Sequence, residues 1–543
     1  MSAPSTLAGV ASPAMHVLMA AAEDDALPGG KVGGIGDVVR DLPPALARLG
    51  CAVSVVTPAY GRLAELAAAR HVGDLEVSFR GSLQTVSLHE VAAPRPTQGV
   101  RHYVLDHPDL APCGRGVIYC DDPPSRPFAT DASKFALFCA AVAELTERDL
   151  LPTPDVLHLH DWHAALTLAL RRYRVRPGGW RKLHCVFTIH NLALQGIRPF
   201  DGDESALDAW FPALPYQHAA LADPRWPQCV NPMAVGIRLA DAVHVVSPTY
   251  AREILTPGDP FGRGLHGGEG LEADLAAADA EGRLVGILNG CEYPQDAPPR
   301  PSWPALRDAM RAQNLVWSAG RATVASAHFV AQARLAGLGA RRPSPLVTSI
   351  GRITAQKVRL LLERAGDGRP AIEAVLDTIG EDGLLVILGT GDPVLEQALV
   401  EVSARRGNLI FLRGYSDAVA RDLYAAGDLF LMPSSFEPCG ISQMLAMRAG
   451  QPCLVHRVGG LVDTVRPGVD GFGFEGSSVT AQVDGMVAAL AGALALRRDD
   501  RPGWQRVRKA AAAARFSWDA SAAACIERLY RPATTGAGGD DAA

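Results

Sequence analysis

The chain alternates short apolar runs with helical patterns, and each run is followed by glycine or polar residues. This alternation is typical of parallel sheets covered by helices on both faces, because parallel neighbours need a crossover connection. The runs form two series. The first lies at residues 16–21, 52–57, 156–159, 186–190 and 243–247, and the second at 346–350, 384–388, 409–412, 429–433 and 452–456. The sequence therefore predicts an α/β protein with two doubly wound domains.

The domain boundaries follow from length and from proline. A chain of 543 residues is too long for one ordinary hydrophobic core, and the proline-rich stretches 296–304 and 341–345 separate the two series. We expect an N-terminal domain over 15–300, a linker region over 301–345 and a C-terminal domain over 346–515. Residues 1–14 and the Gly- and Asp-rich tail 534–543 are expected to be disordered.

Composition excludes several classes of protein. The formal charge of -6 gives no electrostatic footprint for nucleic acid, so an anionic ligand must be held by local groups. The ten cysteines are scattered without CxxC pairs, which favours reduced thiols over disulfides or zinc. No apolar run is long enough to span a bilayer, and the start lacks the pattern of a signal peptide. We therefore expect a cytoplasmic protein with no membrane partner.

One segment is echoed in the two halves. Residues 31–39 read KVGGIGDVV and residues 457–465 read RVGGLVDTV. Paired glycines between a strand and a helix let backbone N–H groups approach an anion. The echo predicts an anion site at each turn, and the alternative is a pair of tight strand-to-helix turns. The residues concerned are Lys31, Gly33, Gly34, Asp37, Gly459 and Gly460.

An ordered set of motifs extends this signal across most of the chain. The blocks are KVGGIGDV at 31–38, HDWH at 160–163, TIHNLA at 188–193, QG at 195–196, VSPTYARE at 246–253, LNG at 288–290, GR at 351–352, QK at 356–357, GTGD at 389–392, PS at 433–434 and FEPCG at 436–440. Their content and order resemble those of the bacterial glycogen synthases and plant starch synthases.

The resemblance implies a fold, a reaction and a set of ligands. The fold is GT-B, with two Rossmann-like domains facing each other across a cleft and a final helix, 516–533, crossing back to the first domain. The activity is retaining transfer of glucose from ADP-glucose to the non-reducing end of an α-1,4-glucan, without a cofactor. A UDP-glucose donor, a small acceptor, and an inactive glucan-binding or regulatory protein remain alternatives. The sequence leaves the oligomeric state open.

Two cationic residues follow the first strand of the second series. A departing nucleoside diphosphate needs neutralising charge, and Arg352 and Lys357 lie where open α/β sheets bind ligands. A solvated surface pair is the alternative.

The rival way to hold a diphosphate is a metal ion bound between carboxylates. The nearest candidates are 24–25, 121–122 and 499–500, but they lie in turn-like surroundings, and we predict no metal site.

Candidate catalytic residues follow strands in both halves. His190 ends the run before it, and the resemblance places its counterpart beside the donor glucose, although a strand-end cap is the alternative. Asp161 follows another strand and is a candidate to assist the acceptor hydroxyl or to orient catalytic groups, while Trp162 is expected to pack in the core. No carboxylate pair of the glycoside hydrolase type is predicted.

The FEPCG block is the most specific motif. Glu437 is predicted to bind glucose hydroxyls, with a helix cap as the alternative, and the N–H groups of Cys439 and Gly440 are predicted to face sugar or phosphate. A nucleophilic Cys439 is disfavoured, since glucosyl transfer does not need it. The resemblance adds Asn289 to the substrate-binding residues.

Overall fold

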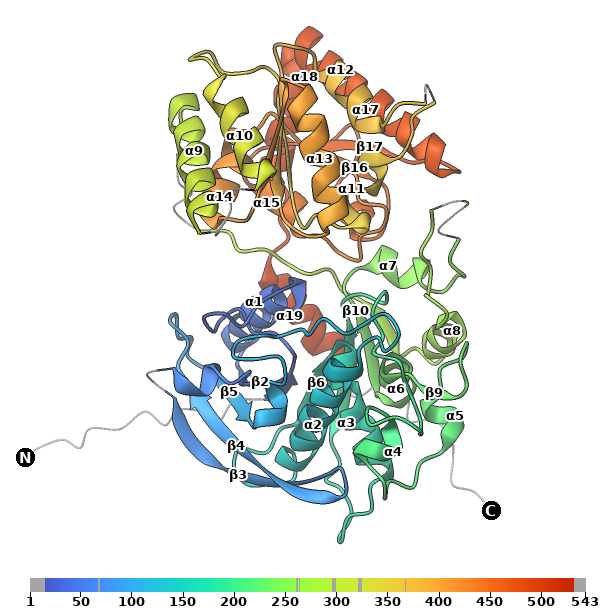
Figure 1. Ribbon diagram of the computed structural model, residues 1–543. Helices are drawn as coiled ribbons and strands as arrows, with labels where there is room; N and C mark the ends of the chain where they lie inside the picture. Colours follow the sequence, from blue (N-terminus) through green and yellow to red (C-terminus); the bar gives the residue numbers. More distant parts are fainter. Residues whose placement is uncertain are drawn as a thin grey trace, which may run out of the picture. The chain divides into compact units, whose positions relative to one another are not determined.

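The computed structural model describes residues 15–531 except 67–68, 260–261, 263, 295–298, 321–324 and 367 (Figure 1). The expected disordered segments 1–14 and 534–543 lie outside the described residues. The chain divides into two compact units. The first contains the residues up to Val245, Gly270–Ile287 and those from Trp518 onward, and the second contains Val246–Glu269 and Leu288–Ser517.

A nine-stranded sheet forms the centre of the first unit, in the order β11-β10-β7-β6-β1-β2-β5-β4-β3. Its strands are β1 Met15–Ala20, β2 Cys51–Pro58, β3 Arg70–Phe79, β4 Ser82–Val91, β5 Val100–Asp106, β6 Val156–His160, β7 His184–Ile189, β10 Ala242–Val245 and β11 Leu284–Gly286. The pairs β3–β4 and β4–β5 are antiparallel, and the other pairs are parallel. The order reverses direction between β1 and β6, which is where open α/β sheets bind ligands.

Helices cover this sheet and supply its core. They are α1 Gly34–Arg48, α2 Ala129–Leu145, α3 Asp161–Tyr173, α4 Leu207–Trp210, α5 His218–Leu221, α6 Pro232–Leu239, α8 Glu272–Ala280 and α19 Trp518–Cys525, with 3₁₀ turns at Leu63–Glu65 and Pro108–Leu110 and a small β8–β9 ribbon, Arg198–Pro199 with Cys229–Val230. Helix α1 shows how sequence sets this packing. Val38, Leu42 and Ala45 recur at helical spacing, and all are buried in one cluster with β1 and β2.

The C-terminal segment belongs to the first unit. Helix α19 packs against α1 and continues into a π-helical turn, Ile526–Tyr530. Trp518, Leu529 and Tyr530 are buried in the α1 cluster, and the Tyr530 hydroxyl lies 2.9 Å from Nδ1 of His158 on β6. The last helix therefore completes the core beneath the first sheet.

The second unit contains a six-stranded parallel sheet in the order β14-β13-β12-β15-β16-β17. The strands are β12 Leu346–Ile350, β13 Leu384–Gly389, β14 Leu409–Arg413, β15 Leu429–Met432, β16 Cys453–His456 and β17 Gly471–Phe474. Numbered within the unit, the order is 3-2-1-4-5-6, the order of dinucleotide-binding folds. The point of reversal lies between β12 and β15.

Helices cover both faces of the second sheet. The helices of this unit are α7 Pro248–Glu253, α9 Trp303–Ala319, α10 Ser326–Ala336, α11 Ala355–Leu362, α12 Ala371–Ile379, α13 Pro393–Arg405, α14 Asp417–Ala426, α15 Ser442–Arg448, α16 Gly460–Thr464, α17 Val479–Asp499 and α18 Arg501–Ala513. Helix α17 is long and apolar enough to cross a membrane, but Val483, Met486 and Leu490 of its buried face join the core of this unit.

All ten strands expected from the sequence are present, with ends shifted by a few residues. The β3–β4 hairpin was not anticipated. The outward residues of β3 alternate with buried ones, so this hairpin has no continuous apolar run. The expected linker 301–345 carries α9 and α10, whose buried residues pack into the core of the second unit. Proline at the first turn of α9 starts a helix rather than breaking one.

The cysteine expectation needs a correction. Cys113 and Cys120 form a disulfide in the first unit, with Cα atoms 5.9 Å apart, so the prediction that all ten cysteines are reduced is wrong for this pair. The loop between Pro108–Leu110 and α2 folds back and brings the two together without CxxC spacing. The other eight are free thiols.

Leu529→Ala is expected to lower the free energy of unfolding by about 2–5 kcal/mol, because it opens a cavity at a fully buried site in the α1 cluster. Glu527→Ala, an exposed change in the same turn, is the control and should have an effect below about 0.5 kcal/mol. Thermal and urea unfolding would measure both. Equal stability of the two variants would contradict the assignment of this segment to the core.

Candidate active site

The glycine-rich turn of the first unit lies between β1 and α1, at the point where the strand order reverses. Its backbone N–H groups already hold an anion. Oε2 of Glu23 accepts hydrogen bonds from Val32 N at 2.9 Å and Gly33 N at 2.6 Å. Oε1 of Glu23 accepts one from the Tyr119 hydroxyl at 2.7 Å. No side chain caps the start of α1, and a Cβ on Gly34 would meet nothing within 4 Å, so space for a ligand remains at Gly34 among the described residues.

Lys31 and Asp37 lie together on this turn. The Lys31 ammonium is 2.5 Å from Asp37 Oδ1 and 3.4 Å from Asp25 Oδ2, and Arg40 also contacts Asp25. Burial lowers the pKa of Lys31, but the two carboxylates outweigh it and raise the pKa overall. The lysine therefore stays charged at neutral pH, in the same turn as Gly34.

Asp161 and His190 form the second half of this unit's candidate site. Asp161 begins α3 after β6, in a left-handed conformation with φ of 52°. Its Oδ1 accepts the backbone N–H of His190 at 2.7 Å. Burial raises the pKa of Asp161 to about 8, although hydrogen bonds from the backbone of His190 and Asn191 oppose the shift. The carboxyl thus fixes the chain at the end of β7, which supports the orienting role over direct contact with the acceptor.

A buried array of imidazoles lies behind His190. Nε2 of His190 is 2.9 Å from Nδ1 of His160, whose ring stacks on His158 at 4.4 Å. His158 Nε2 is bonded to the Thr188 hydroxyl at 2.6 Å, which in turn contacts His244. Burial, reinforced by His160 and His244, lowers the pKa of His190 well below 6.5. The His190 ring is therefore neutral at pH 7. Sequence reasoning missed the array, because its members lie on, or directly after, three different strands.

Trp162 packs in the core, as expected. It is buried against Phe128 and Phe135, and a Cβ on Gly196 would stand 2.1 Å from its ring. The glycine of the QG motif therefore makes room for this indole.

The acidic pairs considered for a metal have protein partners. Asp24 is bonded to His102 at 2.6 Å, Asp122 to the Thr130 hydroxyl at 2.6 Å, and Asp499 to Arg498 at 2.8 Å. Within the part of the chain that the structure describes, no three His, Cys, Asp or Glu side chains are grouped so as to hold a metal ion.

The second unit brings Lys357 and Glu437 into direct contact. Lys357 lies in the first turn of α11, after β12, and Glu437 lies in the loop after β15, so both stand at the reversal of strand order. The Lys357 ammonium pairs with Glu437 Oε2, which also accepts a hydrogen bond from the Ser434 hydroxyl at 3.0 Å. Glu437 is buried, whereas Arg352 is exposed and pairs with no carboxylate of the described residues.

Backbone contacts hold the loop of Glu437. Gly460 N donates to Glu437 O at 3.0 Å, and a Cβ on Gly459 would stand 2.0 Å from that oxygen. A Cβ on Gly460 would stand 2.3 Å from the carbonyl oxygen of Cys439. The two predicted motifs, FEPCG and RVGG, therefore meet, and the glycine pair is required for close approach.

Cys439 and Asn289 adjoin this contact. Burial raises the pKa of the Cys439 thiol far above its ordinary value, and a hydrogen bond with the backbone of Asn289 only partly opposes the shift. The structure therefore supports a packing role for the thiol, not a nucleophilic one. Gly440 has φ of 79°, and α15 begins two residues later, at Ser442.

A second unexpected carboxylate binds the second glycine turn. Oε1 of Glu253, at the end of α7, accepts the N–H of Gly459 at 2.8 Å. Burial raises the pKa of Glu253, and the Gly459 bond opposes the shift. Glu23 and Glu253 thus occupy equivalent turns in the two units. The internal echo was the signal for the turns, but nothing in the sequence pairs either glutamate with them.

Gly459→Ala is expected to lower the free energy of unfolding by at least about 3 kcal/mol, since the methyl group would collide with Glu437 O at a φ of 46°. Gly468→Ala is the matched control. It has φ of 77° but open space around its Cβ, and should cost only about 1–2 kcal/mol. Urea unfolding compares them, and equal costs would show that the close approach is not needed.

Asp161→Asn is expected to flatten the pH dependence of stability. The folded pKa of about 8 lies above the ordinary 3.8, so the folded state binds the extra proton and wild-type stability falls as pH rises from about 4 to about 8. Asparagine keeps an oxygen for the His190 N–H and tolerates the left-handed conformation. The variant should therefore gain in relative melting temperature from pH 5 to pH 8. Parallel curves would contradict the raised pKa.

Comparison with known proteins matches both units to glycosyltransferases. The starch synthase catalytic domain family matches residues 16–277, and glycosyl transferases group 1 matches residues 344–492. A glycogen synthase of Streptococcus sanguinis is 35% identical over 95% of this chain and 99% of its own, and one from Anaeromyxobacter dehalogenans is 34% identical over the same shares.

Solved structures agree in fold. The catalytic domain of starch synthase IV from Arabidopsis thaliana, bound to ADP and acarbose, matches with a TM-score of 0.72 and 27% identity, covering 95% of this chain and 98% of that chain. Sucrose-phosphate synthase from Thermosynechococcus elongatus matches in fold, with a TM-score of 0.53 and 18% identity over 95% of this chain and 98% of its own. The GT-B fold class is thereby confirmed. From the similarity over nearly the whole chain, this protein belongs to the family of bacterial glycogen synthases and plant starch synthases.

Proposed function

We propose that this glycosyltransferase moves glucose from ADP-glucose to the non-reducing end of an α-1,4-glucan, with retention of configuration, in the cytoplasm. The observation that carries the proposal is the Lys357–Glu437 pair at the strand reversal of the second unit. A buried carboxylate and an ammonium side by side offer one group for sugar hydroxyls and one for phosphate.

The cationic residues suit the leaving group. When the bond between the sugar C1 and the phosphate oxygen breaks, negative charge develops on the diphosphate. Lys357 and the exposed Arg352, which pairs with no carboxylate in the described part of the chain, are the groups we assign to that charge. The acceptor oxygen forms the new bond to C1 on the face that the diphosphate leaves, and its proton passes to the leaving phosphate oxygen. This step needs no protein nucleophile, in keeping with the raised pKa of the Cys439 thiol.

Glu437 and the neutral His190 are assigned to the sugar. The Glu437 carboxylate keeps one oxygen, Oε1, outside its contacts with Lys357 and Ser434, and this oxygen is our candidate acceptor for glucose hydroxyls. A neutral His190 ring can accept or donate a hydrogen bond without adding a positive charge that would oppose an oxocarbenium-like centre. Asp161 positions His190 through its backbone.

The choice of ADP-glucose over UDP-glucose as the donor is based on the ligands of a related structure. The starch synthase IV catalytic domain is described as bound to ADP and acarbose, which supports an adenine nucleotide and a saccharide as ligands here. We also propose that no cofactor or metal takes part. UDP-glucose and small acceptors are the alternatives that the assay must separate.

The decisive assay incubates the purified protein with glycogen and radiolabelled ADP-glucose or UDP-glucose in EDTA, followed by precipitation of the glucan. Label is expected in the precipitate from ADP-glucose, and β-amylase should release it from the chain ends. Incorporation from UDP-glucose alone would overturn the donor, transfer to free glucose alone would overturn the acceptor, and loss of activity in EDTA that Mg²⁺ restores would overturn metal independence. Absence of transfer from either donor would favour a binding or regulatory protein.

Lys357→Ala is expected to lower kcat by about 100-fold or more, because it removes a charge that stabilises the departing diphosphate. Arg359→Ala is the matched control on the same helix, where Arg359 pairs with Glu363, and it should keep near-normal turnover. Because Lys357→Ala leaves Glu437 buried without its counterion, the Lys357→Gln/Glu437→Gln double variant separates stability from catalysis. This double variant should be folded by circular dichroism yet inactive, and near-normal turnover would refute the assignment.

A further inference from the structure

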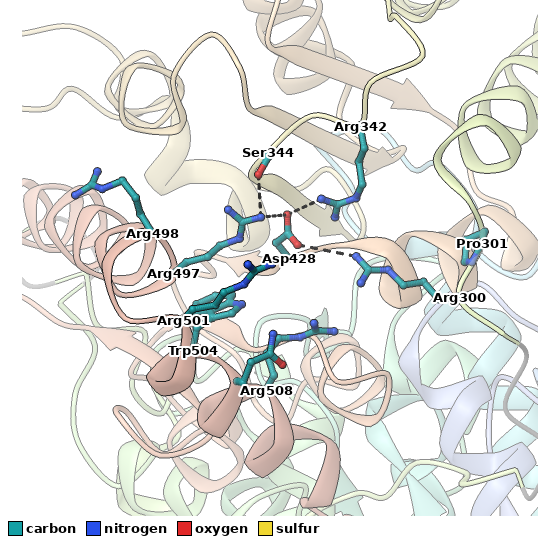
Figure 2. A pocket seen from close by; sticks show the side chains of 11 residues that line it. Arg300, Pro301, Arg342, Ser344, Asp428, Arg497, Arg498, Arg501, Trp504 and Arg508 are labelled. Carbon is teal, nitrogen blue, oxygen red and sulfur yellow. Dashed lines mark hydrogen bonds and ion pairs between the residues drawn. The ribbon is translucent and has the colours of Figure 1, made fainter.

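A pocket of about 490 Å³ in the second unit is lined mainly by arginine (Figure 2). Its walls come from the residues before α9, the segment before β12, the residue before β15, the end of α17 and one side of α18. The lining residues that carry the argument are Arg300, Arg342, Asp428, Arg497, Arg501 and Arg508. The proposed function assigns no role to any of them.

The pocket lies at the opposite edge of the sheet from the Lys357–Glu437 pair. Ser344 precedes the first residue of β12 and Asp428 precedes the first residue of β15, whereas Lys357 and Glu437 follow the last residues of these parallel strands. Strands of this length separate the two edges by roughly 15 Å. The arginine pocket is therefore a different place from the proposed donor site.

A single carboxylate cannot balance the cations. Asp428 Oδ2 already accepts from Leu346 N at 2.8 Å and contacts Arg342 and Arg497 at 3.0 Å each. Arg300 reaches only 3.9 Å from Oδ1. Figure 2 shows these three guanidinium groups converging on Asp428, while Arg498 points away from it. The arginines thus outnumber the acidic groups of the pocket.

Two further arginines, Arg501 and Arg508, line the pocket from α18. Neither pairs with a carboxylate among the residues the structure describes. Arg508 donates instead to the carbonyl oxygen of Gly450 at 3.1 Å. Burial and the charge of Arg342 lower the pKa of Arg300, in keeping with repulsion among the cations. Such a concentration of positive charge is unexpected in a chain of formal charge -6.

Part of the cluster has a structural task. Arg300 and Arg342 both donate to the carbonyl oxygen of Ala426, the last residue of α14, at 2.6 and 2.7 Å. These bonds stabilise a helix end and explain two of the arginines. They do not explain Arg501 or Arg508, which lie on another helix, α18, and form no hydrogen bond with Ala426 among the described contacts.

We propose that this pocket binds a small metabolite carrying two phosphate groups, at a site separate from the donor site. Guanidinium forks match phosphate oxygens in pairs, and several of them converge here on a cavity within the size range of small-molecule sites. The buried Trp504 forms part of the wall and gives the pocket one rigid side.

The test is calorimetric titration of the purified full-length protein with glucose 1,6-bisphosphate, with glucose as the uncharged control. The wild type should bind the bisphosphate, and binding should weaken as salt is added. Arg501→Gln/Arg508→Gln should raise Kd at least about tenfold, because each loss removes a charge-assisted contact, while circular dichroism shows that the variant is folded.

The matched control is Arg506→Gln/Lys509→Gln. It removes two charges from the same helix at exposed positions that do not line the pocket, and Kd should change by less than about twofold. The proposal is overturned if the wild type does not bind the bisphosphate, if Arg501→Gln/Arg508→Gln binds it normally, or if both double variants weaken binding equally, which would indicate diffuse charge instead of a site.

Discussion

The close approach of two loops in the second unit is the constraint on which the candidate site depends. The loop after β15 and the turn after β16 touch through their backbones, with Gly460 N bonded to Glu437 O at 3.0 Å. A side chain at Gly459 would occupy the position of that oxygen. Because these atoms are fixed, the Glu437 carboxylate contacts Lys357 at the reversal of strand order. The Cys439 side chain is buried for the same reason.

The same device recurs in both units. Glu23 binds the N–H groups of one glycine turn and Glu253 binds an N–H of the other. A carboxylate on backbone N–H groups satisfies donors that would otherwise be costly to bury. The similar sequences of the two turns therefore reflect a similar backbone geometry. In each turn, only the backbone N–H groups that do not bind the glutamate can donate to a ligand.

Sequence reasoning reached most of the fold because apolar runs and helical periods are local signals. All ten expected strands are present, and the ordered motifs identified the family. The β3–β4 hairpin was not predicted because its exposed residues interrupt the apolar pattern. Helix α9 was not predicted because the prolines around its start indicate a linker, whereas one of them begins the helix. Among the predicted site residues, Lys357 and Glu437 meet, whereas Arg352 stands apart from both in the contacts described.

The sequence by itself determined the two α/β series, the positions of the glycine turns and the family. Tertiary structure alone decided that Glu23 and Glu253 fill those turns, that burial raises the pKa of Asp161, and that arginines from three segments converge on Asp428. The physical reason is distance along the chain. Strand and turn preferences act between neighbours in sequence, whereas desolvation and charge depend on groups that only the folded chain brings together.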